Sequence, residues 1–440
     1  MKIAGGHPWP RMGGLPSGPT PSRVSPGEAC EASDLVALGP GGAPLRSSAS
    51  MPRWLADYER ALGVGEEALA LRREALREEG PLMLYRMFPQ LFREDLQGPY
   101  RQLSQLLPGS APRLWLAGDA HVGNFGTVRK PSGEVIWTLN DYDQGGKGRA
   151  DYDLCRAGAS LALLGRVEGW SEEECERVVS ALGRHYARSI HDFAQHSPSS
   201  SLGVKASEAR EPLLKLIQKA EKKTQAELLS KWATLGSEGY RFQFDDQLRE
   251  LTPSQRKHLD AVLKKFDLHG ARVLDRGVRL DAGGSSMGLE RFYLLVQKGQ
   301  QELPRLLEVK HVLPSALLAR SPEPSGCDAE KLRASFKQLG APGDPWMDIA
   351  RDRDGVYLLR ERQSAKDSLK LGKLSVDEAE NVARHMGRLL AQAHAMQGKA
   401  GELKDWVGDR SQRFETALAE FSRVYAGQVV QDHQALSDAR

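Results

Sequence analysis

The sequence predicts an α+β protein of two lobes, in which a helical lobe comes first and a strand-rich lobe second. Helical periodicity and helix start signals run to about residue 265, whereas short apolar runs typical of strands begin near residue 271. The chain has 440 residues, 40% of them hydrophobic and 27% charged, so it is long enough for more than one globular unit. We expect a tail (1–50), a mainly helical lobe (51–268), a strand-rich lobe (269–370) and C-terminal helices that pack on the helical lobe (371–440).

The first fifty residues are rich in glycine, proline and serine, as in GGLPSGPTPS at 13–22. Such a stretch buries too little apolar surface to offset the entropy lost on ordering, so we expect it to be disordered. One explanation is that Met51 is the true start and that the reading frame is over-extended.

From Met51 to about residue 107 the pattern is helical, with Trp54, Tyr58 and Leu62 on one face. Two apolar runs, 114–116 and 135–139, then predict strands. Between them GDAHVGNFGTVRKPSGE is polar and rich in glycine, which predicts a loop and a hairpin turn. Helices follow again, and their start signals include Ser171 with Glu174, three residues later.

In the strand-rich part the expected strands are ARVL, RFYLLVQKG, LPRLLEVKHVL and VYLLRER. A long amphipathic helix follows, with a capping box formed by Ser375 and Glu378, and Gly398 ends it.

Composition excludes several classes of protein. Sixty-one Lys and Arg against 58 Asp and Glu leave a net charge of +3, too small to indicate a nucleic-acid or membrane-surface binder. No apolar run approaches the ~18 residues that a membrane span needs. The four cysteines show neither zinc-ligand spacing nor a disulfide framework, so a reducing cytoplasm is the expected location.

One cluster of polar residues is the candidate for a catalytic site. Asp119, His121 and Asn124 lie in GDAHVGNFG, and Asp141 and Asp143 follow the next strand in LNDYDQG. A hairpin would bring Asp119, Asn124 and Asp141 to one edge, where oxygen ligands could hold Mg²⁺ and a carboxylate could accept the proton of an attacking hydroxyl. The Asp-x4-Asn spacing is that of the kinase catalytic loop. Aspartate, asparagine and glycine are also ordinary turn residues, which is the simpler explanation.

A second cluster favours the kinase interpretation. The glycine-rich turn GGSSMG precedes a strand, and Lys310 lies in the later strand LEVKHV. Glycine lets backbone N–H groups approach phosphates, and a strand lysine supplies a positive charge for them. In an ordinary kinase the glycine loop and lysine precede the catalytic loop. Here they follow it, so the order indicates circular permutation, and Lys310 should face Asp141 across one cleft.

These blocks resemble a known family. GDAHVGNFG, LNDYDQG with DYDLCRAGASLAL, GGSSMGLERFYLLV with LLEVKHV, YLLRERQSAK and GRLLAQAHAM are similar to the bacterial DUF2252 family over about residues 80–400. The first two blocks also resemble the catalytic and metal loops of aminoglycoside phosphotransferase-like kinases. The resemblance implies a protein-kinase-like fold, but the DUF2252 family brings no assigned reaction with it.

The kinase likeness assigns roles residue by residue. Asp119 would be the catalytic base, with His121 orienting its loop and Asp153 bracing that loop from the next helix. The Mg²⁺ ligands would be Asn124 and Asp141, with Asp143 as a weaker candidate for a second metal. The residues that would bind the phosphates of ATP are Gly284, Ser285, Ser286, Gly288 and Lys310. The roles of Arg360 and Lys366, which match a family block, stay open.

The sequence also departs from the family. His311 stands where an acidic residue usually follows the strand lysine, and LYRMFPQLFREDL lacks the expected Arg-Gly pair. A glutamate partner for Lys310 cannot be assigned, and Glu330 is the candidate.

We therefore expect a cytoplasmic, ATP- and Mg²⁺-dependent phosphotransferase of permuted kinase-like fold. Its partners would be a nucleotide and an unknown hydroxyl acceptor, with neither nucleic acid nor membrane involved. Two alternatives stay open. One is a nucleotide-binding pseudokinase or regulatory scaffold, and the other is a metal-dependent phosphoesterase, which would need further histidine ligands.

Overall fold

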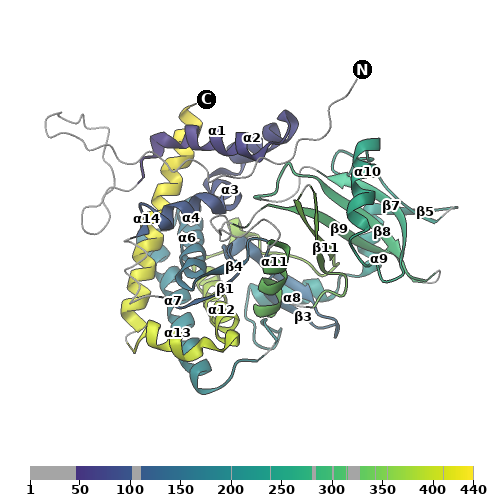
Figure 1. The fold of residues 1–440 in the computed structure, drawn as a ribbon. Coiled ribbons are helices and arrows are strands. Elements are labelled where there is room, and N and C mark those ends of the chain that lie inside the picture. The colour runs from purple at the N-terminus through teal and green to yellow at the C-terminus, as the bar shows by residue number, and fades with distance from the viewer. Residues whose placement is uncertain are drawn as a thin grey trace.

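The computed structural model describes most of the chain after residue 45. The described residues are 46–101, 111–199, 201–237, 239–279, 284–299, 302–313, 315, 328–341, 343–353, 355–409 and 411–439. The architecture is α+β, as expected, with a helix-rich region beside a strand-rich region (Figure 1). None of the described helices combines the length and apolar character needed to cross a membrane.

The helix-rich region is built from both ends of the chain. Its long helices α6, α7, α12 and α14 pack on one another, so the C-terminal helices return to the helices of the first half. The region contains α1 (Met51–Leu62), α2 (Glu66–Glu78), α3 (Gly80–Met87), α4 (Pro89–Gln97), α6 (Asp151–Val167), α7 (Glu172–Gln195), α12 (Val376–His394), α13 (Ala400–Val407) and α14 (Ser411–Asp438).

The helix boundaries follow the start signals in the sequence. Ser171 caps α7 and Ser375 caps α12, and each makes a reciprocal capping box with the glutamate three residues later. After α12 the chain continues as a π-helical turn to Lys399. Gly398 has a φ of 77° there, which glycine adopts without steric cost, and α13 begins at Ala400.

The tail expected at 1–50 falls largely outside the described residues, but its last five residues belong to the fold. Arg46 donates to the carboxylates of Asp95 (2.8 Å) and Asp432 (2.6 Å). Ser48 accepts a hydrogen bond from Gln428 of α14 and begins a short 3-10 helix (Ser48–Ser50). The folded chain therefore begins before Met51, because Arg46 provides the positive charge for two buried carboxylates.

Four short strands carry the polar loops next to α6. β2 (Phe125–Arg129) and β3 (Val135–Leu139) form the expected hairpin, and β1 (Arg113–Leu116) pairs with β4 (Gly146–Arg149). β4 was not predicted, because GKGR has no apolar side chain. Both pairs pack on the helical core through Leu114, Phe125 and Trp137.

The strand-rich region is a five-stranded antiparallel sheet in the order β10-β11-β9-β8-β7. The strands are β7 (Arg272–Arg279), β8 (Arg291–Gln297), β9 (Arg305–Val312), β10 (Asp348–Asp352) and β11 (Gly355–Glu361). Lys310 of β9 lies opposite Arg291 of β8 and Leu358 of β11. Four of the strands were expected, whereas β10, with the sequence DIARD, was not.

The two faces of this sheet differ. One face is apolar and is covered by α10 (Pro253–Leu263) through Leu259 and Val262. On the other face, α11 (Asp328–Gln338) covers one edge, and α9 (Gln225–Trp232) with the hairpin of β5 (Ala233–Gly236) and β6 (Gly239–Phe242) covers the opposite edge. Because side chains alternate along a strand, Arg291, Glu308 and Lys310 lie on the face away from α10, between these covers.

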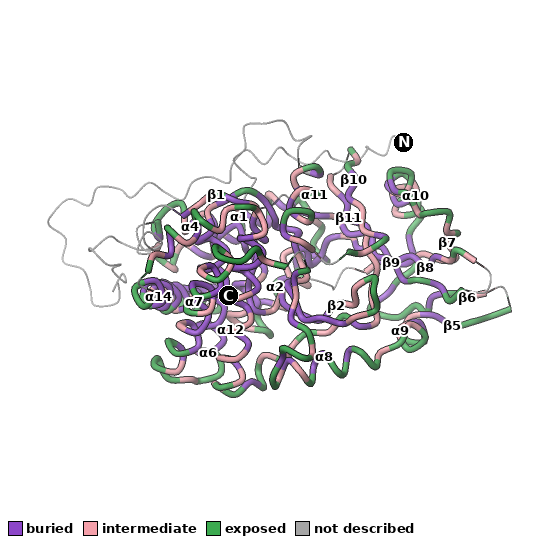
Figure 2. Tube along the Cα trace, turned by 90° about the horizontal axis from the view of Figure 1, so that it is seen from below, coloured by how far each residue is buried: buried purple, intermediate pink, exposed green. Residues whose placement is uncertain are grey.

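The strand-rich region therefore includes segments that precede its sheet in the sequence. α9, the β5–β6 hairpin and α10 pack on the sheet, although they lie within the segment 51–268 that we expected to join the helical lobe. The division by packing falls near residue 224, close to α8 (Leu213–Glu221), which packs on β2 and β3. Figure 2 shows that β8, β9 and β11, like much of the helix-rich region, are largely buried.

Candidate functional site

The loop that carries Asp119 is held in place by Asp153 at the start of α6. The Asp153 carboxylate accepts hydrogen bonds from the backbone N–H groups of Ala117 and Gly118, both at 2.9 Å. Asp153 is fully buried and its Oδ2 lies 3.4 Å from His394 Nε2. The expected bracing contact is present, and it fixes the backbone immediately before Asp119.

The Asp119 side chain is oriented from two sides. Arg156 Nε donates to Asp119 Oδ1 at 2.8 Å, and Arg156 is fully buried. Asn124 Nδ2 donates to the Asp119 carbonyl at 2.8 Å and reaches Asp119 Oδ2 at 3.3 Å. The Asp-x4-Asn spacing thus closes a compact loop in which Oδ1 is tied to an arginine, while Oδ2 makes only a long bond to an amide.

His121 is a neutral member of this loop. Its Nδ1 accepts a hydrogen bond from the Gly123 N–H at 3.1 Å, which leaves the proton of the neutral ring on Nε2, 3.6 Å from Asp119 Oδ2. Burial lowers the pKa of His121 to about 3, and the positive charges of Arg86 and Arg156 act in the same direction. An uncharged histidine in this position fits the expected role of orienting the loop.

Asp141 and Asp143 lie at the same end of the hairpin as Asn124. The Asn140 N–H donates to the Asn124 carbonyl at 3.0 Å, in line with the β2–β3 pairing, so the residues after β3 stand beside those before β2. The Asp143 N–H donates to Asp141 Oδ1 at 3.4 Å. The hairpin therefore places Asn124 and Asp141, two of the three residues that we expected at one edge, at the same end of the hairpin, and Asp143 lies beside them.

Lys310 contacts this edge from the sheet. Its ammonium forms a buried ion pair with Asp143, although the two residues are 167 positions apart in the sequence. It also acts electrostatically on Asp141. The two sequence clusters thus meet in space. The suggested partner Glu330, by contrast, is an exposed residue of α11, so the carboxylate partner of Lys310 in this structure is Asp143.

A buried charge network surrounds Lys310 on the same sheet face. Glu308 is 1% exposed and receives Arg291 Nη1 and Arg360 Nε, both at 2.7 Å. Arg360 Nη1 also lies 3.9 Å from Asp141 Oδ1. Five cationic side chains therefore act on four carboxylates, which leaves an excess of one positive charge while Lys366 is charged. These residues are Arg291, Lys310, Arg360, Arg362, Lys366, Glu308, Asp141, Asp143 and Asp344.

The two aspartates titrate in opposite directions. Burial acts to raise the pKa of Asp141, but the positive charges of Lys310, Arg360 and Lys366 outweigh it and hold that pKa below its ordinary value. Burial and the negative charge of Asp141 raise the pKa of Asp143. Asp141 is therefore ionised. Asp143 Oδ1 is a buried oxygen without a hydrogen-bond partner.

The glycine-rich turn is fastened to the helix-rich region. Arg72 Nη1 of α2 donates to the carbonyls of Ser285 (3.0 Å) and Met287 (2.8 Å). Gly288 has a φ of 80°, and a Cβ atom there would lie 2.8 Å from the Ala68 Cβ, so this position requires glycine. Ser286 is buried and its hydroxyl accepts a bond from Arg291. Gly284 and Ser285 remain partly accessible.

Sequence reasoning missed the arginines and the glutamate that organise the site. Glu308 could have been found, because it lies two residues before Lys310 and therefore on the same strand face. Arg156 could also have been found, because it lies one helical turn after Asp153. Arg72 reaches the turn from 213 positions away in the sequence, and no local signal indicates that contact.

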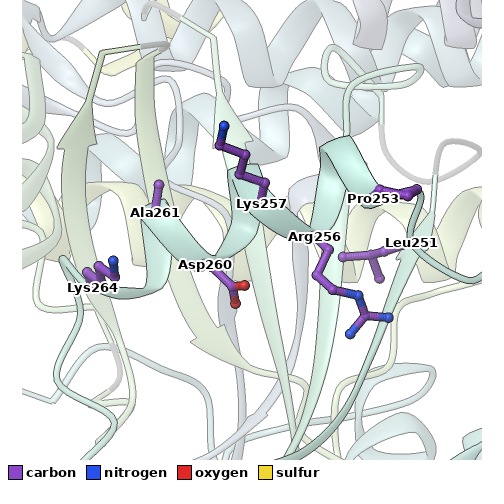
Figure 3. Close-up of a pocket in the computed structure, with 7 residues that line it drawn as sticks. All are labelled: Leu251, Pro253, Arg256, Lys257, Asp260, Ala261 and Lys264. Carbon is purple, nitrogen blue, oxygen red and sulfur yellow. The ribbon is translucent and has the colours of Figure 1, made fainter.

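Other hollows lie elsewhere. The one in Figure 3 is lined by α10 residues such as Arg256, Lys257 and Lys264, on the helix that covers the apolar face of the sheet, away from Lys310. Within the part of the chain that the structure describes, no group of three His, Cys, Asp or Glu side chains is arranged to hold a metal ion. The Asp119 and Lys310 clusters are the stronger candidates because they gather buried carboxylates and cations where the sheet meets the helices.

The fold and the site define an α+β protein whose charged, largely buried centre lies where a five-stranded antiparallel sheet meets a helix-rich region. The chain belongs to the DUF2252 family, described as an uncharacterized protein conserved in bacteria, whose family model matches residues 65–439. This confirms the family resemblance seen in the sequence. Neither the curated proteins nor the solved structures contain a match to this chain.

Proposed function

We propose that this protein is an ATP- and Mg²⁺-dependent phosphotransferase with a circularly permuted kinase-like fold. The observation that carries the proposal is the ion pair between Lys310 and Asp143, which lies next to Asp141. This ion pair joins the lysine of strand β9 to the loop that follows the β2–β3 hairpin. A kinase site needs these parts in one place, and they come from segments 167 residues apart.

The topology of the sheet supports the same function. The glycine-rich turn joins β7 to β8, the lysine lies on the third strand β9, and α11 follows before β10 and β11. Protein kinases place a glycine-rich loop over the phosphates, a lysine on the third strand and a helix after it. Here this unit follows the Asp-x4-Asn loop in the chain, which is the permuted order.

The chain's own residues then take separate roles. Asp119 would accept the proton of the acceptor hydroxyl, while Asn124 and His121 hold its loop. The excess positive charge around Lys310 would bind the phosphates of ATP. The closed contact between Arg72 and the glycine turn would keep solvent from the reacting groups.

The oxygen-rich edge fits a magnesium ion. Asp141 is ionised, Asp143 Oδ1 has no hydrogen-bond partner, and Asn124 supplies an amide oxygen at the same hairpin end. Two carboxylates and an amide are hard oxygen donors, and Mg²⁺ usually completes such a set with water and substrate phosphates. When bound, the ion would supply charge neutralisation for the phosphates.

A second candidate function is nucleotide binding without turnover, as in a pseudokinase or scaffold. The buried ion pair between Arg156 and Asp119 favours it, because the arginine already occupies one oxygen of the carboxylate that would act as the base. The phosphoesterase alternative gains no support from the described residues, which contain no preformed group of three metal-ligating side chains.

The test measures thermal unfolding of the full chain with ATP, with and without Mg²⁺. A ligand that binds only the folded state raises stability by RT ln(1 + [L]/Kd), about 2.7 kcal/mol at a hundredfold excess over Kd. We expect a Mg²⁺-dependent rise that Asp141→Asn abolishes and that the control Asp192→Asn, an exposed residue of α7, retains. No rise at millimolar ATP in a folded protein would reject nucleotide binding, and binding without ATP hydrolysis would favour the scaffold.

A further inference from the structure

Arg86, near the end of α3, carries a positive charge for which the described residues provide no partner. Its Nε is buried and donates no hydrogen bond, and Arg86 makes neither a hydrogen bond nor an ion pair with any other described residue. Its neighbours differ, because Arg72 binds backbone carbonyls and Arg156 binds Asp119. A guanidinium group partly withdrawn from water is costly unless an anion or acceptor meets it, so Arg86 points to a ligand.

Arg86 lies between the two loops of the candidate site. A Cβ atom placed on Gly123, in the Asp119 loop, would lie 3.7 Å from Arg86 Nε. A Cβ atom placed on Gly284, in the glycine-rich turn, would lie 3.5 Å from the Arg86 carbonyl oxygen. The Arg86 side chain therefore lies against the Asp119 loop and its backbone against the glycine-rich turn, so a group bound between the base and the turn would lie within reach of it.

The position of Arg86 is fixed by its surroundings. Tyr85, the preceding residue, donates to the Arg156 carbonyl at 2.8 Å, and its own carbonyl accepts from Arg156 Nη2 at 2.7 Å. The turn on the other side is held by Arg72, and its Met287 and Leu289 side chains enter the helical core. Arg86 is thus carried by a rigid frame that joins the helices to the turn.

We propose that Arg86 binds the terminal phosphoryl group of the bound nucleotide and stabilises its negative charge during transfer. This inference rests on the proposed function and adds to it a cation supplied by the N-terminal helices. In the reaction the bond from the terminal phosphorus to its bridging oxygen breaks, and a bond to the acceptor oxygen forms. The acceptor proton passes to Asp119, ADP leaves, and Arg86 forms no covalent bond.

The test compares the full chain's affinity for two nucleotides by calorimetry in the presence of Mg²⁺. The probes are a non-hydrolysable ATP analogue and ADP, and the variants are Arg86→Ala, Arg86→Lys and the control Arg77→Ala, an exposed residue of α2. Loss of a charge-assisted contact to the terminal phosphate should weaken analogue binding about ten- to a hundredfold in Arg86→Ala. ADP binding should change less than about threefold, because ADP lacks that group.

Two further readouts separate a binding role from a structural one. Free guanidinium ion at millimolar concentration should restore part of the analogue affinity to Arg86→Ala, and Arg86→Lys should be intermediate. If Arg86→Ala does not fold, the comparison of the two nucleotides in Arg86→Lys decides the question. Equal losses for both nucleotides, or no loss, would overturn the role of Arg86 and leave the proposed function intact. Failure of the unaltered protein to bind either nucleotide would overturn both.

Discussion

Two buried charge clusters, one in each region of the molecule, are built in opposite ways. In the helix-rich region Arg46 lies between Asp95 and Asp432, and all four carboxylate oxygens accept hydrogen bonds, some of them from Tyr425 and Gln428. At the sheet, the cluster around Lys310 has more cations than carboxylates, and Asp143 Oδ1 has no hydrogen-bond partner. The first cluster is closed and the second is open.

We infer from this difference that the charges of the Arg46 cluster stabilise the fold, whereas those of the Lys310 cluster bind a ligand. A closed network has its hydrogen bonds satisfied, so removing one member exposes the others to the full cost of burial. An open cluster with excess positive charge is stabilised further when an anion binds. We therefore expect changes in the Arg46 cluster to alter stability, and changes in the Lys310 and Asp119 clusters to alter binding or turnover.

The largest effect is expected at Asp119. Asp119→Asn removes the proton acceptor but keeps an oxygen that can accept the bond from Arg156, so the loop should remain in place. ATP hydrolysis should fall about 10²- to 10⁴-fold, the usual contribution of a general base, while Mg²⁺-dependent ATP binding should stay within about threefold. Steady-state hydrolysis and calorimetry check the two parts. Unchanged hydrolysis in this variant would remove Asp119 from the role of base.

The next effect tests the closed cluster. Arg46→Ala leaves Asp95 and Asp432, both about 1% exposed, without their positive charge. Breaking a buried pair in this way should lower the free energy of unfolding by about 3–5 kcal/mol, measured by urea denaturation. A chain that starts at Met51 should lose a similar amount, because it also lacks Arg46. ATP affinity should stay within about twofold in the folded variant, and a large loss of affinity at unchanged stability would contradict the comparison.

Whether an element could be predicted from the sequence depends on how far apart in the chain its interacting residues lie. The caps at Ser171 and Ser375 and the β2–β3 hairpin depend on neighbours in the chain, and the sequence predicts them. β4 and β10 were not predicted, because their sequences, GKGR and DIARD, have little apolar pattern. These strands form by pairing with a partner strand. Periodicity alone cannot reveal which partner that is.

The same limit applies to the site. Asp119, Asn124 and Asp141 could be placed together because one hairpin joins them, and Lys310 because its strand follows a glycine-rich turn. The contacts of Arg72 with the turn and of Arg46 with α14 join segments more than two hundred residues apart. Such contacts depend on how whole helices pack, which short motifs do not encode.

The smallest effect concerns Lys366, on the exposed rim of the open cluster. The positive charge of Arg360 lowers the pKa of Lys366 to about 7, desolvation adds to this, and Asp141 and Glu308 act against it. Lys366 is therefore charged below pH 7 and neutral above it, so the cluster loses one positive charge as the pH rises from 6 to 8. Lys366→Arg keeps that charge throughout, because arginine stays protonated.

The affinity of the unaltered protein for Mg²⁺ and ATP should therefore fall, relative to that of Lys366→Arg, by about fivefold between pH 6 and pH 8. At an effective dielectric of about 20, two unit charges roughly 10 Å apart interact with ~1.7 kcal/mol, and the change in charge of Lys366 between pH 6 and pH 8 captures part of such an interaction. Titration of ATP itself cancels in the ratio, because both proteins bind the same ligand. Equal pH profiles would show that Lys366 lies outside the field of the bound phosphates.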